Sequence, residues 1–190
     1  MSKISATIIT YNEEKNISRC INSLLGIADE IIVVDSGSED KTQDIALKLG
    51  AKVIINKFKG HIQQKNFAIT QTSNDWVISL DADEALSNEL KKSLIKIKKN
   101  LKGHGYKFNR LTNYCGKWIK HCGWYPDTKL RLFKKGKGCW SGKNPHDVYI
   151  LNSGKETYLK GDILHYTFYE VSEHKAQIKK FSDIAAQSLF

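Results

Sequence analysis

Apolar and polar positions alternate along residues 1–90 with two different periods. Short runs of consecutive apolar residues, many of them β-branched, predict strands at 5–10, 30–35, 51–55 and 75–80. Between these runs, apolar residues recur every three or four positions and predict helices at 14–25, 38–50, 61–72 and 87–100. Ser38 or Asp40 is the expected N-cap of the second helix, and Ser87 is the expected N-cap of the fourth.

Strands that are apolar along their whole length are typical of a parallel sheet with helices on both faces. The alternation of strand and helix therefore predicts an α/β fold with right-handed crossovers. In such sheets, ligands bind beyond the carboxyl ends of the strands. Polar clusters follow three of the predicted strands, and we expect these clusters to converge on one edge of the sheet: 10–14, 35–38 and 81–84.

The second half of the chain is β-rich. Residues 106–125 are aromatic and β-prone, with a turn expected at Gly116. Further strands are expected at 129–133, 148–151 and 162–169, followed by a helix over 170–190. No linker rich in proline, glycine or serine occurs, so we expect a single domain whose two halves are residues 1–100 and 101–190.

The net charge of the 190-residue chain, +10, is concentrated in its middle third. Residues 91–143 contain 16 lysine and arginine residues and one acid, Asp127. A block of this kind favours polyanions, such as nucleic acid, anionic lipid head groups or phosphorylated sugars. The alternative is a lysine-rich surface that is simply solvated.

The composition limits the class of protein. With 41% hydrophobic residues and 2 prolines, the chain is expected to fold. It has no run of about 18 apolar residues and no signal-peptide pattern, so we expect a cytoplasmic protein. The 4 cysteines lack CxxC spacing and are expected to be reduced thiols. The alternative is a zinc site formed by Cys115, Cys122, Cys139 and His121.

The stretch WVISLDADEAL, residues 76–86, joins an apolar strand directly to three acids, Asp81, Asp83 and Glu84. Carboxylates next to a buried strand are costly without a partner. Two carboxylates one residue apart at a strand exit suit a hard divalent cation, which in turn binds the oxygens of substrate phosphates. The alternative is that Asp83 and Glu84 begin a helix, where acids stabilise the dipole, but Asp81 fits that alternative poorly.

Four motifs occur in order at the expected strand ends: TIITYNEEKNI (7–17), IIVVDSGSEDKT (32–42), QQKN (63–66) and SLDADE (79–84). With these motifs the sequence resembles the inverting family 2 glycosyltransferases, which bind nucleotide sugars with a GT-A fold. Three later motifs resemble the branch that contains the lipopolysaccharide-core glucosyltransferases: GWYPDTKLRLF (123–133), PHD (145–147) and KGDILHYTF (160–168). The resemblance covers roughly residues 4–175, and members of the family usually continue with more helical sequence.

The resemblance implies a mostly parallel GT-A sheet flanked by helices, with a nucleotide-sugar-binding first half and a β-rich acceptor-side second half. It implies a metal-dependent hexosyltransferase that moves a sugar such as glucose from a nucleotide-diphosphate donor, UDP-linked, to a hydroxyl of a lipid-linked or phosphorylated glycan. The expected cofactor is Mn²⁺ or Mg²⁺. The expected location is the cytoplasm, with peripheral contact to the anionic inner face of the cytoplasmic membrane, and no nucleic-acid partner is expected.

The resemblance also assigns roles to individual residues. Nucleotide-sugar binding falls to Thr10, Tyr11, Glu13, Asp35, Gly37, Lys65, Asp81 and Ala82. Metal binding falls to Asp83, with His165 as a further ligand. Asp147 matches the position of the catalytic base, and Asp127 is its rival. Acceptor binding falls to Trp124, Tyr125, Arg131 and His146.

Several of these residues also have an ordinary structural interpretation. A simple turn would account for Gly37, and a solvated helix lysine would account for Lys65. A buried histidine bonded to the backbone would account for His165. A turn residue would account for Asp127, and core packing would account for the aromatic residues on the acceptor side.

Three other functions are compatible with parts of the sequence. The basic block suits a nucleic-acid-binding module, with affinity that falls steeply with salt, but the acidic strand ends argue against it. A sugar nucleotidyltransferase typically carries a glycine-rich, basic loop after its first strand, where this chain has the acidic TYNEE at 10–14. A transferase that has lost its chemistry and serves as a binding partner is distinguished only by an activity assay.

Overall fold

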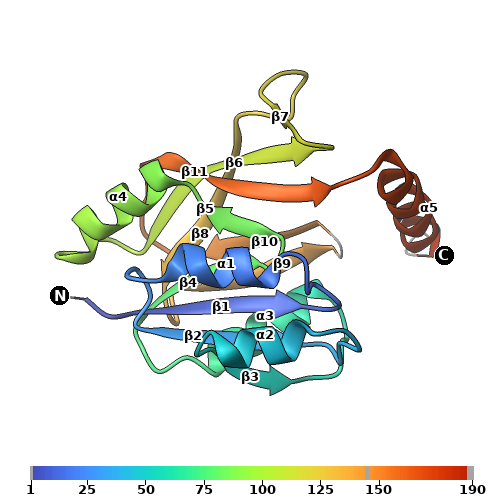
Figure 1. Ribbon diagram of the computed structural model, residues 1–190. Helices are drawn as coiled ribbons and strands as arrows, with labels where there is room; N and C mark the ends of the chain where they lie inside the picture. The colour runs from blue at the N-terminus through green and yellow to red at the C-terminus, as the bar shows by residue number, and fades with distance from the viewer. Residues whose placement is uncertain (1, 144–145, 188–190) are drawn as a thin grey trace.

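The first half of the chain folds as its apolar pattern predicts. In the computed structural model, which describes residues 2–143 and 146–187, four parallel strands lie in the order β3, β2, β1, β4 (Figure 1). They are β1 (Ile4–Thr10), β2 (Glu30–Asp35), β3 (Lys52–Ile55) and β4 (Trp76–Asp81). The helices between them are α1 (Ile17–Leu24), α2 (Thr42–Lys48) and α3 (His61–Thr70). The side chains of residues 146, 180, 181 and 183–187 lie outside this description.

The second half extends the same sheet. β8 (Asp127–Lys134) pairs antiparallel with β4 and with β6 (Gly105–Tyr114), and β11 (Glu156–Phe168) runs parallel to β6. β5 (Glu84–Leu86) closes the far edge against β11, and β7 (Lys117–Ile119) pairs with β6. The order β3-β2-β1-β4-β8-β6-β11-β5 makes one continuous sheet from both halves. The expected α/β fold with a β-rich second half is confirmed.

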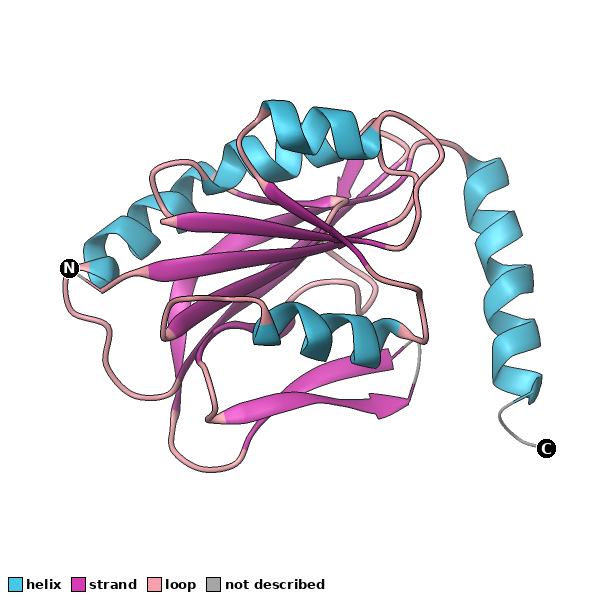
Figure 2. Ribbon diagram, turned by 90° about the horizontal axis from the view of Figure 1, so that it is seen from below, coloured by secondary structure: helices cyan, strands magenta, loops and turns pink. Residues whose placement is uncertain are grey.

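Helices and a hairpin cover the two faces of the sheet (Figure 2). α1, α2 and α4 (Asn88–Lys98) contribute to the larger apolar core, together with side chains of β1, β4 and β6. On the other face, α3 packs on the sheet beside a hairpin of β9 (Gly138–Lys143) and β10 (His146–Leu151). Because both faces are covered, the inner strands β1 and β4 are buried along almost their whole length, whereas the edge strand β3 is partly exposed.

The last helix, α5 (Val171–Gln187), stands away from the rest of the fold (Figures 1 and 2). The ring of His174 packs on Phe168 and Tyr114 and so joins the start of α5 to the sheet. Its aliphatic residues Val171 and Ile178 are 51% and 53% exposed. The expected helix is thus present over 171–187, and none of the described helices is long and apolar enough to cross a lipid bilayer.

The predicted helix caps have different outcomes. Ser87 caps α4 as expected, and its hydroxyl accepts a hydrogen bond from the backbone N–H three residues ahead at 3.2 Å. The predicted cap of α2, Ser38 or Asp40, is wrong, because the helix begins at Thr42 and neither residue is its N-cap. Both side chains form hydrogen bonds in the preceding loop instead, where Ser38 donates to Asp35.

Gly161 lies where β11 passes the start of α4, and its φ of +110° is in the left-handed region. A Cβ at this position would lie 2.3 Å from the backbone nitrogen of Leu90. Both backbone strain and steric overlap therefore oppose a side chain here. We expect Gly161→Ala to lower the free energy of unfolding by about 3 kcal/mol, measured by chemical denaturation.

Gly116→Ala is the matched control for this substitution. Gly116 also has a positive φ, +85°, but nothing lies within 4 Å of the place that its Cβ would take. The free energy of unfolding of this variant should therefore fall by about 1 kcal/mol, which is the cost of the backbone conformation alone. Equal losses in the two variants would contradict a role for the close approach between β11 and α4.

Candidate active site

The loops that follow β1 and β2 are joined at the carboxyl edge of the sheet. The backbone N–H of Asn12 donates to the Ser38 hydroxyl at 2.8 Å, and the Asn12 side chain accepts from the backbone of Glu39 at 2.9 Å. The backbone N–H of Glu13 donates to the Thr42 hydroxyl at 2.8 Å. Two of the three expected polar clusters therefore lie side by side, as the parallel strand order requires.

The residues predicted to bind the nucleotide differ in their exposure. Tyr11 is 55% exposed at the rim, whereas Thr10 at the end of β1 is buried. Asp35 is also buried, and its oxygens accept four hydrogen bonds from Gly37 N, Ser38 N, Ser38 Oγ and Gln43 Nε2. Because a carboxylate has about four acceptor positions, Asp35 shapes its own loop, and its contact with a nucleotide base stays a prediction.

The acids of SLDADE lie at a turn between two strands, so the alternative that they begin a helix is wrong. β4 ends at Asp81 and β5 begins at Glu84, which pairs in antiparallel register with His165 of β11. Asp83 Oδ2 lies 3.1 Å from His165 Nε2, and the Asp83 carbonyl accepts from the backbone N–H of Tyr166 at 2.9 Å. The strand pairing therefore brings the two predicted metal ligands into contact.

Two side chains contact the ring nitrogens of His165. Thr167 Oγ lies 2.9 Å from Nδ1 and 3.3 Å from Nε2, and Nε2 also contacts Asp83. Burial by itself lowers the pKa of His165, but the Asp83 carboxylate raises it, and the net shift is upward. Thr167 thus helps to fix the orientation of the His165 ring, as second-shell partners of metal-binding histidines do, and Asp83 stays the other predicted ligand.

Glu13 forms part of the wall of a cavity of about 380 Å³, which Asp83, Tyr166 and Tyr169 also line. Burial raises the pKa of Glu13 to about 7, the hydrogen bond from Asn16 at 2.8 Å opposes the rise, and the charge of Asp83 adds to it. Near neutral pH this carboxyl group is therefore partly protonated and can both donate and accept hydrogen bonds.

Two buried cations hold the remaining acids of the turn. Arg131 on β8 donates to Glu84 Oε1 at 2.9 Å and to Asp81 Oδ2 at 3.1 Å. Lys65 on α3 lies 2.9 Å from Asp81 Oδ1, and both cations are almost fully buried, at 4% and 2% exposure. Burial alone would raise the pKa of Asp81, but the charges of Lys65 and Arg131 hold it well below its usual range. Asp81 is therefore ionised throughout the neutral range.

Lys65 also reaches into the second half of the chain. Its Nζ lies 2.8 Å from Asp147 Oδ2 on β10 and 4.5 Å from the ring centre of Trp140 on β9. The alternative of a solvated helix lysine is therefore wrong. Lys65 joins the predicted sugar-binding Asp81 to the predicted base, and its contact with the nucleotide stays a prediction.

The residues on both sides of Lys65 in the QQKN motif make equally specific contacts. Gln64 Nε2 donates to Ser36 Oγ, in the loop after β2, at 3.1 Å. Asn66 exchanges two hydrogen bonds with the backbone of Trp140, donating at 2.9 Å and accepting at 3.0 Å. Successive helix residues point about 100° apart, so three neighbours on α3 hold three separate segments: the β2 loop, the turn after β4, and the β9–β10 hairpin.

Sequence reasoning missed three residues of this network, Gln64, Asn66 and Glu84. The signal for the first two was the uninterrupted polar run QQKN on a helix that must cover a sheet. Glu84 had no predicted role of its own beyond the alternative of a helix start, but its side chain is fully buried and its Oε2 accepts from the backbone N–H of Asp81 at 3.0 Å.

The two predicted bases occupy different places. Asp147 shares its lysine partner with Asp81, and its side chain is 9% exposed. Asp127 at the start of β8 is bound by Arg110 at 2.9 Å and by Lys129 at 2.9 Å. Burial alone would raise the pKa of Asp127, but these two cations hold it below its usual range. Arg110 then links Asp127 to Glu84 at 3.8 Å, so Asp127 reaches Asp81 only through Glu84 and Arg131, whereas Asp147 shares Lys65 directly with Asp81.

The residues predicted on the acceptor side lie in different settings. Arg131 is buried beneath the turn after β4, where it contacts acids. Trp124 is 38% exposed, and its ring packs on Tyr114 with the centres 6.0 Å apart. Tyr125 donates to a carboxylate of β11 at 3.0 Å. His146 begins β10, and its side chain lies outside the described residues, so the acceptor roles stay predictions.

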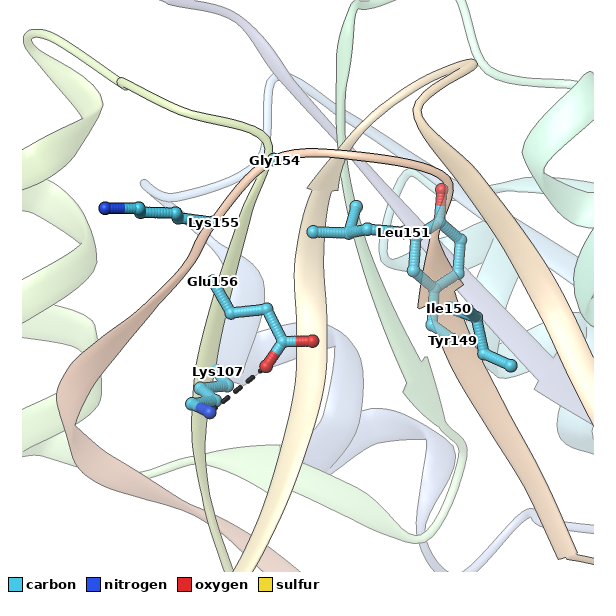
Figure 3. Close-up of a pocket in the computed structure, with 7 residues that line it drawn as sticks. All are labelled: Lys107, Tyr149, Ile150, Leu151, Gly154, Lys155 and Glu156. Carbon is cyan, nitrogen blue, oxygen red and sulfur yellow. Dashed lines mark ion pairs between the residues drawn. The ribbon is translucent and has the colours of Figure 1, made fainter.

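A second cavity, of about 500 Å³, lies beside β10 and the first residues of β11 (Figure 3). Seven residues line it: Lys107, Tyr149, Ile150, Leu151, Gly154, Lys155 and Glu156. Lys107 and Glu156 form an ion pair at 3.1 Å in its wall. None of the predicted site residues is among these seven. The residues predicted for binding and catalysis therefore lie outside this cavity.

The acids and the histidine at this edge do not form a complete metal cage. Across the described ranges 2–143 and 146–187, no group of three or more His, Cys, Asp or Glu side chains is arranged to hold a metal ion. The zinc site considered for the cysteines is therefore not supported. Asp83 and His165 lie in contact, and their roles as metal ligands stay predictions.

The fold and its strand-end acids belong to a known family. Residues 5–151 match glycosyl transferase family 2, and the chain belongs to that family. An uncharacterized glycosyltransferase of Rickettsia typhi is 37% identical over 100% of this chain and 68% of its own length. The lipopolysaccharide core biosynthesis glycosyltransferase LpsC of Rhizobium meliloti is 29% identical over 96% of this chain and 70% of its own length.

Other matches cover less. An uncharacterized glycosyltransferase of Rickettsia bellii is 58% identical over 46% of this chain, and that alignment spans 30% of the relative. Among solved structures, residues 1–349 of S. aureus TarS superpose with a TM-score of 0.51 and 21% identity, over 70% of this chain and 47% of that one. A crystal of the same TarS domain in complex with UDP gives a TM-score of 0.50 at 24% identity, over 63% and 38%. These likenesses support the GT-A fold.

Lys65→Met tests the buried charge network. The substitution keeps an unbranched side chain but leaves Asp147 without its ion-pair partner and leaves Asp81 paired with Arg131 alone. We expect the free energy of unfolding at pH 7 to fall by about 3 kcal/mol, measured by urea denaturation. The difference from wild type should shrink below about pH 4. The reason is that a depressed carboxylate pKa stabilises the fold above the unfolded-state pKa, and this contribution is lost as the pH falls through the folded-state pKa.

Lys160→Met is the matched control, because Lys160 pairs with Glu89 at 2.8 Å on the surface, where its side chain is 81% exposed. Surface pairs of this kind contribute little to stability, so this variant should unfold nearly as wild type does. A loss in Lys65→Met as small as that of the control, or one that is constant with pH, would contradict the network.

Proposed function

We propose that this protein is an inverting glycosyltransferase. It would take a hexose from a nucleotide-diphosphate donor, UDP-linked, and transfer it to a hydroxyl of a lipid-linked glycan such as lipopolysaccharide core. The observation that carries the proposal is the Lys65 bridge, which ties Asp81, at the predicted sugar site, to Asp147, the predicted base. An inverting transfer needs sugar binding, a base and stabilisation of the leaving group within reach of one sugar ring.

The donor would bind over the carboxyl ends of β1, β2 and β4, where ligands bind in sheets of this kind. The exposed ring of Tyr11 offers a surface for the nucleoside, and Gly37, with a φ of +91°, lets the β2 loop turn without a side chain in the way. The Asp81 side chain is 27% exposed and ionised, so it can accept hydrogen bonds from sugar hydroxyls while its two cations hold it in place.

Asp83 and His165 fit a divalent cation, Mn²⁺ or Mg²⁺. Asp83 Oδ2 and His165 Nε2 lie 3.1 Å apart, so both atoms would be available to the same ion. The remaining positions would be taken by water and by the donor diphosphate, the usual arrangement for these ions in phosphate-handling sites. When bound, the cation would neutralise charge that develops on the diphosphate as it leaves.

Side chains of this protein can accept the proton that the acceptor hydroxyl loses. The acceptor hydroxyl attacks the anomeric carbon from the face opposite the diphosphate, and the bond to the diphosphate oxygen breaks as the new bond to the hydroxyl oxygen forms. Asp147 takes the hydroxyl proton, and the Lys65 ammonium at 2.8 Å holds that carboxylate in position. Asp127 remains the alternative base, and it lies further from Asp81 in the network of ion pairs than Asp147 does.

Two observations support the proposed class of acceptor: the similarity to LpsC and the positive charge of the middle third of the chain. LpsC, similar over nearly the whole of this chain, carries lipopolysaccharide core biosynthesis in its name. The basic block at 91–143 suits a phosphorylated glycan. Trp124 and Tyr125 supply aromatic faces that suit sugar rings. Arg131 would support the site from beneath, because its guanidinium binds the acids of the turn.

Calorimetric titration of UDP tests the donor site. Binding is expected with Mn²⁺ present, and it should be lost with EDTA or in Asp83→Ala, because the cation would link the diphosphate to that carboxylate. Asp75→Ala is the matched control, since it removes an exposed carboxylate just before β4, at the opposite end of the same strand, and should bind as wild type does. Binding that ignores the metal or Asp83→Ala would contradict the assigned role of Asp83.

Asp147→Asn tests the base. The variant should bind UDP as wild type does, but the release of UDP from a UDP-sugar in the presence of lipid-linked acceptor should slow by about 100- to 10,000-fold, the range for loss of a general base. Asp127→Asn should retain most of the rate. The opposite pattern, with turnover lost in Asp127→Asn and kept in Asp147→Asn, would assign the base to Asp127.

A further inference from the structure

Residues 115–124 form a projecting hairpin, here called the finger, between β6 and β8. β7 lies within it and pairs with β6, and the hairpin extends beyond the body of the sheet (Figure 1). The chain has 4 tryptophans. The two in the finger, Trp118 and Trp124, are each 38% exposed, whereas Trp76 and Trp140 are 6% and 3% exposed.

The finger carries aromatic, aliphatic and cationic residues close together. Lys117 and Lys120 are exposed on either side of Trp118 and Ile119, and no acid occurs in the sequence between Glu89 and Asp127. Tryptophan rings are enriched at the level of lipid head groups, where one part of the ring contacts apolar chains and the other stays wet. Lysines beside them attract the phosphates of anionic lipids.

The finger is ordered before any partner binds. The Trp118 ring packs edge-on against Tyr166 with the centres 5.3 Å apart, and Arg19 lies 3.5 Å from the centre of the same tyrosine ring. Trp124 packs against Tyr114, which also contacts His174 at the start of α5. Because these rings are already held in place, little side-chain freedom is lost on docking.

The same aromatic contacts tie the finger to the active site. Tyr166, beneath Trp118, lines the cavity that contains Asp83, and its backbone N–H donates to the Asp83 carbonyl at 2.9 Å. The finger therefore lies beside the mouth of that cavity. A surface that receives the finger would also lie beside the mouth, where a lipid-linked acceptor has to enter.

We infer that the finger docks the protein on an anionic bilayer, through Trp118, Lys117 and Lys120, with the cavity mouth next to the membrane plane. The purpose of this docking rests on the proposed function, which gives the acceptor a lipid anchor. The charge complementarity and the exposed tryptophans do not depend on it.

A bilayer fits this surface better than a nucleic acid does. Val171 and Ile178 of the neighbouring α5 are half-exposed aliphatic side chains, which suit lipid and offer no stacking face for a base. A nucleic acid running past the mouth would also meet the carboxylates of Glu14, Asp40 and Glu173 in the rim of the cavity.

The test uses the full chain and vesicles of phosphatidylglycerol mixed with phosphatidylcholine, with pure phosphatidylcholine vesicles for comparison. Co-sedimentation should show binding to the anionic vesicles that weakens with salt. Tryptophan fluorescence should shift to the blue and be quenched by brominated lipid, because the exposed tryptophans are both in the finger. No binding to anionic vesicles, or binding without a change in tryptophan fluorescence, would overturn the inference.

Matched charge reversals locate the contact. Lys117→Glu/Lys120→Glu should weaken vesicle binding by about 20-fold or more, since each lysine near an anionic surface is worth about fivefold. Lys92→Glu/Lys96→Glu makes the same change of charge on exposed α4 residues, on a different side of the molecule (Figure 1), and should weaken it by far less. Equal losses would mean unspecific attraction between net charges and would overturn docking by the finger.

Two further measurements separate the explanations. Trp118→Ser should lower vesicle affinity and brominated-lipid quenching while circular dichroism and UDP binding stay as in wild type. If the variants keep vesicle binding but lose affinity for a poly(U) oligonucleotide, the finger is a nucleic-acid site and the inference fails. In the wild-type protein, absence of vesicle binding with intact UDP binding would count against the docking alone, whereas absence of UDP binding with intact vesicle binding would count against the proposed function.

Discussion

Carboxylates that are taken out of water must be matched by positive charge, and this requirement organises the strand-end edge of the sheet. Asp81, Glu84 and Asp147 meet there, and Lys65 and Arg131 are the cations that balance them. The five side chains come from β4, β5, β10, α3 and β8. Because each partner would be left as an uncompensated buried charge without the others, the network fixes these five segments relative to one another.

The site is consequently a product of both halves of the chain. α3 connects three segments of the site, since Gln64, Lys65 and Asn66 bind the β2 loop, the turn after β4 and the β9–β10 hairpin, respectively. The antiparallel pairing of β5 with β11 adds the second connection, which sets His165 against Asp83. The groups proposed to bind sugar, hold the cation and take the proton are therefore carried by covered strands and a covered helix, which keeps them in one geometry.

Much of the fold and part of the site could be predicted from the sequence, because local periodicity reports which faces are buried. The apolar runs and the helical repeats predicted β1 to β4 with the helices of the first half, and several strands of the second half. The short strand β5 and the hairpin strand β9 were not predicted. The parallel order then required the polar strand ends to meet, which placed Asp35 and Asp81 at one edge. The cap of α2 was mispredicted because Ser38 had a competing partner, Asp35, that lies before the helix.

Acting alone, the sequence determined the family, the strand-end acids and the identity of the candidate ligands and bases. Only the tertiary structure decided that Lys65 is buried between two acids, that Arg131 lies under the turn, and that Glu84 belongs to a strand. It also decided that two of the tryptophans are exposed beside the cavity mouth. The physical reason is that a local pattern fixes the face on which a residue lies, whereas its partner comes from a distant segment and is set by how the strands pair and the layers pack.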